Sequence, residues 1–72
     1  MIEVFKTNVH DKVTAEHIIE TISLQFPEVF INFDLEDHDR ILRIESEGDA
    51  LPVGDVITLM NTKGYECEVL ED

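Results

Sequence analysis

The residues of this 72-residue chain that are best suited to chemistry are two histidines with acidic neighbours. His10 precedes Asp11, and His38 stands between Asp37 and Asp39. Imidazole nitrogens and carboxylate oxygens bind zinc and other divalent cations, so these two segments could form a metal-ion site. The alternative is a set of solvated loop residues, because turns collect polar side chains and acidic residues are abundant throughout this chain.

Other catalytic chemistry has little support in the sequence. Cys67 alternates with Val69, which predicts a small buried hydrophobe and not a reactive thiol. The three glycines are isolated and form no phosphate-binding loop. Carboxylate pairs such as Glu45 and Glu47 follow from the number of acidic residues and carry no catalytic information. We therefore predict that the protein is not an enzyme and needs no cofactor, with a bound divalent metal ion as the alternative.

The charge of the chain restricts its partners. Seventeen Asp and Glu residues against five Lys and Arg residues give a formal net charge of -12. Nucleic acids and anionic lipids are bound through Lys and Arg, so we expect neither nucleic acid nor membrane as a partner. A single cysteine excludes an internal disulfide. The sequence shows neither a membrane-spanning apolar run nor a signal-peptide pattern, and we expect a cytoplasmic protein.

The positioning elements follow from the hydrophobic pattern, which predicts one domain over residues 1–72. We expect strands near 2–9, 29–36, 41–46 and 65–70 and helices near 14–26 and 52–63. Thr14 is expected to cap the first helix, Pro27 to end it, and Gly64 to end the second. With right-handed crossovers, this order predicts an α+β, ferredoxin-like βαββαβ sandwich: a four-stranded antiparallel sheet with two helices on one face. The predicted core comprises Ile18, Ile22, Phe33, Leu35, Leu42, Ile44, Val56, Met60, Cys67 and Val69.

Two segments resemble a known family of this size and element order. The segment 63–70, which opens with Lys63, Gly64 and Tyr65, is similar to the start of the last strand in heavy-metal-associated domains, the fold of copper chaperones. The segment 14–18 is similar to the start of their first helix. That family binds Cu(I) through two thiolates of a Met-x-Cys-x-x-Cys loop. The corresponding positions here hold Val9, Asp11 and Thr14, so the resemblance implies the fold but not the thiol metal site.

The predicted fold also groups residues that are distant in the sequence. The end of the first strand, the tip of the central hairpin and the start of the last strand lie at one end of such a domain. We therefore expect His10 and Asp11 near the segment 37–39. The face of the sheet without helices should hold Phe5, Phe30 and Ile41, and an exposed apolar patch of this kind marks an interface, unless these are isolated exposed residues.

These observations favour a protein-interaction or homodimerisation module whose partner is another protein or a second copy. Metal binding through His10, Asp11, Asp37, His38 and Asp39 is the alternative.

Overall fold

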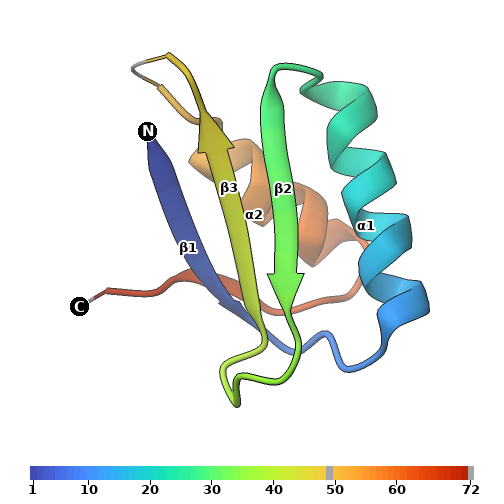
Figure 1. Ribbon diagram of the computed structural model, residues 1–72. Helices are drawn as coiled ribbons and strands as arrows, with labels where there is room; N and C mark the ends of the chain where they lie inside the picture. The colour runs from blue at the N-terminus through green and yellow to red at the C-terminus, as the bar shows by residue number, and fades with distance from the viewer. Residues whose placement is uncertain (49, 72) are drawn as a thin grey trace.

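The computed structural model describes residues 1–48 and 50–71 and confirms the predicted α+β fold. The chain forms β1 (Ile2–Thr7), α1 (Lys12–Gln25), β2 (Val29–Asp34), β3 (Ile41–Ser46), α2 (Val53–Thr62) and β4 (Cys67–Val69). The four strands make one sheet in the order β2-β3-β1-β4, with each strand antiparallel to its neighbours (Figure 1). This is the ferredoxin-like arrangement that the element order predicts.

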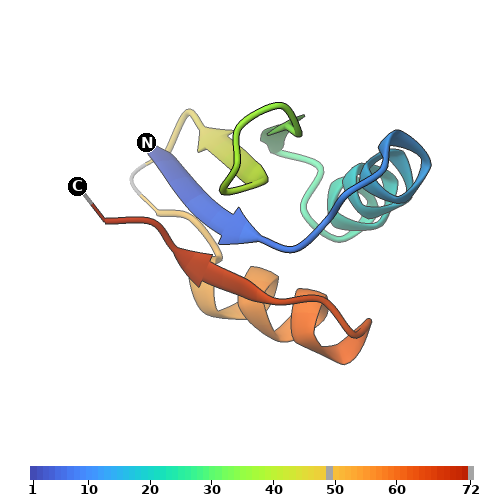
Figure 2. The ribbon, with the colours of Figure 1, turned by 90° about the horizontal axis from the view of Figure 1, so that it is seen from below.

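Both helices cover the same face of the sheet and leave the opposite face bare (Figures 1 and 2). Helix α1 lies beside β2, and α2 lies beside β4. The core fills the space between the sheet and the helices. Its buried members come from both helices, from strands β1, β3 and β4 and from the β1–α1 connection: Phe5, Val9, Ala15, Ile18, Ile22, Leu42, Ile44, Val56, Met60 and Cys67.

The inward face of β1 corrects one expectation. Phe5 is only 1% exposed and lies opposite Leu42 of β3, so it belongs to the core and not to the bare face of the sheet. Ile2 and Val4 point to the bare face instead. The prediction for Phe5 was wrong because β1 has apolar residues at both parities, so alternation alone does not tell which side is buried. In a central strand, the larger aromatic side chain takes the buried side.

The ends of the elements differ from the predicted ones by a few residues. Helix α1 begins at Lys12 because Asp11, and not Thr14, is its N-cap. Strand β4 is limited to three residues. Of the predicted core residues, Phe33, Leu35 and Val69 are only partly buried. Phe33 and Val69 lie on the two edge strands and Leu35 follows β2, so each has core neighbours on fewer sides.

Candidate functional site

The end of β1 holds together the three segments that the fold was expected to gather. The Thr7 amide donates to the Asp39 carbonyl oxygen (3.1 Å), and the Thr7 hydroxyl donates to the Arg40 carbonyl oxygen (2.6 Å). One residue later, the Asn8 side-chain oxygen accepts from the Glu66 amide (2.9 Å). The β2–β3 hairpin is thus tied to the end of β1, and the residue before β4 is tied to Asn8, which follows β1.

The hairpin between β2 and β3 is built by its own carboxylates. The side chain of Asp34 accepts from the Asp37 amide (3.3 Å), and the side chain of Asp37 accepts from the Asp39 amide (2.9 Å). Arg40 closes the turn with a left-handed backbone (φ 49°), and its guanidinium donates to the Leu35 carbonyl oxygen. Since Asp and Asn side chains bond nearby amides in turns, these acidic residues have a structural role at the tip.

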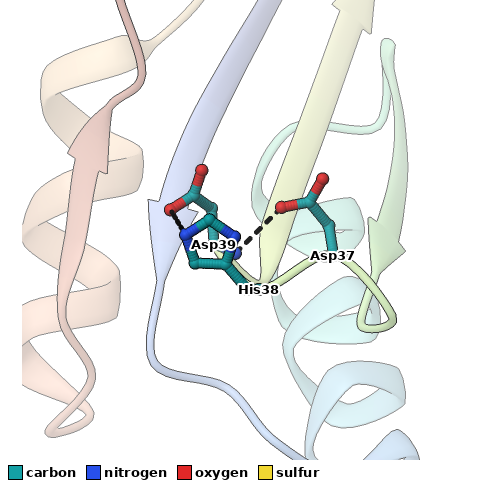
Figure 3. Close-up of side chains that lie close together, drawn as sticks. All are labelled: Asp37, His38 and Asp39. Carbon is teal, nitrogen blue, oxygen red and sulfur yellow. Dashed lines mark hydrogen bonds and ion pairs between the residues drawn. The ribbon is translucent and has the colours of Figure 1, made fainter.

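At the tip, Asp37, His38 and Asp39 bring one potential ligand atom each to within 4.8 Å of one another (Figure 3). The His38 Nε2 atom lies 3.5 Å from the Asp39 carboxylate, and the Lys6 ammonium lies 4.0 Å from the same oxygen. The His38 side chain is 95% exposed. The three groups could bind a divalent cation, but the positive charge of Lys6 opposes a cation at Asp39.

His10 and Asp11 lie outside this group, which is the only such cluster within residues 1–48 and 50–71. His10 is exposed in the connection after β1. The Asp11 carboxylate accepts from the Thr14 hydroxyl (2.7 Å) and the Thr14 amide (3.0 Å), which fixes the start of α1. The bond from the Thr14 hydroxyl, followed by that from its amide, lowers the pKa of Asp11 from its ordinary value of 3.8. Asp11 therefore serves the helix as an ionised cap.

Cys67 is the single thiol of the chain, and it is buried as its alternation predicted. It lies opposite Thr7 where β4 pairs with β1. Burial raises the pKa of the Cys67 thiol to about 11, and the charge of Glu68 adds to the shift. The sulfur is a protonated core atom at neutral pH and is not available as a thiolate ligand or nucleophile.

The bare face of the sheet exposes large apolar side chains. Phe30 on β2 is 63% exposed, as the alternation of β2 predicted, and Ile2 on β1 is 55% exposed. Ile41 and Val4 are half-buried on the same face. Ile2 and Val4 were not among the predicted interface residues, although they occupy the alternate positions of β1 to Phe5 and therefore share the face opposite to it.

An open groove of about 760 Å³ borders this face next to Phe30. The α1–β2 connection and the segment before α2 form its walls, with Phe26, Pro27, Leu51 and Pro52 among the apolar lining residues. The lining is mixed, because Gln25, Glu28 and Glu47 also border the groove.

Comparisons with family models, with curated proteins and with solved structures find no match for this chain. Within the part of the chain that the structure describes, no helix has the length and apolar character needed to cross a membrane.

Proposed function

We propose that this chain is a small, acidic, non-enzymatic domain of the cytoplasm that binds another protein molecule through the bare face of its sheet. The observation that carries the proposal is the exposure of Ile2 and Phe30 on the face that neither helix covers. Exposed apolar side chains that gather on one face are typical of protein interfaces. A single cysteine held as a buried thiol fits a reducing compartment.

The exposed apolar residues of the sheet share one face, on which Glu45 of β3 lies between Ile2 and Phe30, whereas those of α1 stand far apart. Ile2 and Val4 are neighbours on one face of β1, and the chain after β4 continues beside them, because the Leu70 amide donates to the Val4 carbonyl oxygen (2.9 Å). Val13 and Leu24 are also exposed, but they stand at opposite ends of α1, about 16 Å apart along the helix. Isolated exposed apolar residues are ordinary, so the sheet face is the stronger interface candidate.

The local chemistry also supports a heavy-metal-associated fold that works without the thiol site. Asp11 and Thr14, at the positions of the two metal-binding cysteines in that family, are bonded to each other in the cap of α1. Cys67 is buried and protonated. We expect a titration against a competing Cu(I) chelator to show no tight, stoichiometric Cu(I) binding; tight binding at the 9–14 segment would contradict the equivalence of these positions.

Site-specific photocrosslinking in the cells that make the protein tests the proposal. Benzoylphenylalanine in place of Phe30 conserves the aromatic side chain and reports on the sheet face. The same group in place of Leu24, which is 77% exposed on α1, is the matched control. We expect one defined protein adduct from position 30 and none from position 24. Equal labelling from both positions, or no adduct from position 30, would contradict an interface on the sheet.

Metal-ion binding is a second candidate function because Asp37, His38 and Asp39 converge at the hairpin tip. A cation that binds only the folded protein raises its unfolding temperature by mass action. We would therefore measure thermal unfolding with zinc and with chelator for the wild type and for His38→Ala. His17→Ala, an exposed position on α1, is the control. A zinc-dependent rise that His38→Ala alone abolishes supports the site, and its absence from the wild type removes this candidate.

A further inference from the structure

We propose that the molecule bound at the bare face is a second copy of this chain, in a symmetric dimer that packs sheet against sheet. The proposal rests on the interaction function above and specifies its partner. Two observations support the dimer: the distribution of charge over the molecule and the exposed apolar residues of the bare face.

The bare face is nearly neutral in a strongly acidic chain. The outward side chains of the four strands include two basic residues, Lys6 and Arg43, and three acidic residues, Asp34, Glu45 and Glu68. Their net charge is -1. By sequence, the other fourteen acidic and three basic residues give the rest of the chain a net charge of -11, out of the formal -12 of the whole.

This distribution favours a copy over a basic partner. A strongly basic protein would be attracted to the acidic remainder of the chain, and the neutral sheet face would contribute little to its recognition. Two copies of this chain repel each other, and the repulsion between contacting surfaces is smallest where both present a nearly neutral face. The face also contains both signs of charge, which a two-fold related copy can pair across the interface.

The size of the face sets the expected strength of the dimer. Three strands of six residues and the three-residue β4, about 4.8 Å apart, present a flat area of roughly 330 Å² on each copy. Sheets that pack face to face lie about 10 Å apart, with their outer side chains interdigitated. The two faces together are smaller than the roughly 1,200 Å² at which standard specific interfaces begin, so we expect a weak, transient dimer with a dissociation constant of about 100 μM to 1 mM.

Sedimentation equilibrium of the purified chain tests the dimer between about 1 μM and 1 mM, in 50 mM and in 500 mM NaCl. Salt screens the repulsion between the acidic remainders of the two copies, so the dissociation constant should fall by about tenfold or more at the higher salt concentration. Association with a basic partner would weaken with salt.

A matched pair of double variants locates the interface. Ile2→Gln with Phe30→Gln removes the two exposed apolar side chains of the sheet without a change of charge. Val13→Gln with Leu24→Gln removes two similarly exposed side chains from α1. We expect the sheet variant to weaken the dimer at least about tenfold and the helix variant to leave it unchanged. Circular dichroism checks the fold, and the single variant Phe30→Gln serves if the double sheet variant unfolds.

The outcomes separate this inference from the function on which it rests. A chain that stays monomeric at 1 mM in 500 mM NaCl overturns the dimer, as does a dimer that both variants weaken equally. If the photocrosslinker at position 30 captures a different protein while the pure chain is monomeric, the interaction function stands and the second copy is excluded. An adduct between two copies at position 30, together with the expected salt response, supports both.

Discussion

Thr7 offers a direct test of how the end of β1 holds the hairpin. Its side chain is 6% exposed. The hydroxyl donates to the Arg40 carbonyl oxygen (2.6 Å) and accepts from the Val9 amide (3.2 Å). Thr7→Val keeps the branched shape of the side chain and removes both bonds, so the substitution isolates the contribution of the hydroxyl.

The expected loss follows from the groups that the substitution leaves without partners. The Val9 amide is buried, and a buried donor without a partner costs about 1–3 kcal/mol. The Arg40 carbonyl oxygen is only partly buried and can be rehydrated, so it adds less. We expect Thr7→Val to lower the free energy of unfolding by about 2 kcal/mol. This is a large part of the total stability of about 4–11 kcal/mol expected for a domain of this size. Since each kcal/mol shifts the unfolding temperature of such a domain by about 4–8 °C, we expect a fall of about 8–16 °C.

Urea denaturation followed by circular dichroism measures this loss. At about 1 kcal/mol per molar urea, the midpoint should shift by about 2 M with an unchanged slope. Thr7→Ser keeps the hydroxyl and loses one methyl group, for which we expect about 1 kcal/mol. Thr58→Val, at an exposed position of α2, should be neutral. A loss below about 0.5 kcal/mol for Thr7→Val, or a larger loss for Thr7→Ser, would refute the reasoning.

Three further predictions concern the core, the thiol and the helix cap. Ile22→Ala, at a fully buried position of α1, should destabilise the protein by about 2–5 kcal/mol in the same urea assay; a loss below about 0.5 kcal/mol would mean that this side chain is not in the core. Because the pKa of Cys67 is raised to about 11 from an ordinary 9.0, iodoacetamide should alkylate the native thiol at pH 8 roughly 100-fold more slowly than the thiol of the urea-unfolded chain. Equal rates would contradict its burial. The lowered pKa of Asp11 implies stabilisation that is complete above its ordinary value of 3.8 and is lost as the pH falls through the lower folded value. Asp11→Asn, a cap that does not titrate, should therefore lose less stability than the wild type in this acid range, and parallel acid denaturation curves would contradict the capping role.

The sequence was sufficient for the order of the elements because each has a clear period or end signal. The alternation of β2 predicted an exposed Phe30, and Ile41–Ser46 has the predicted bounds. The phase of β1 was not predictable, since both of its faces include apolar residues and alternation alone does not show that the side of Phe5 is the buried one.

The candidate metal site was predictable only where its residues are adjacent in the sequence. Asp37, His38 and Asp39 share one turn, so their proximity follows from chain geometry. The position of Asp11 depends on a different competition. Asp and Thr are both good N-caps, and the structure uses Asp11 as the cap while Thr14 donates to it. Spacing alone does not decide between these two arrangements, and the choice determines whether the Asp11 carboxylate stays free.

The place of β1 in the sheet has a consequence for the order in which the chain matures during synthesis. β1 is made first, yet its neighbours β3 and β4 follow roughly 40 and 60 residues later. A nascent chain that has already joined β1 to β3 still exposes one edge of β1, with backbone groups that pair readily with other chains. The whole of β4, Cys67–Val69, is needed to cover that edge. Ribosome-bound intermediates and products truncated before residue 67 should therefore be the forms of this protein most prone to aggregate.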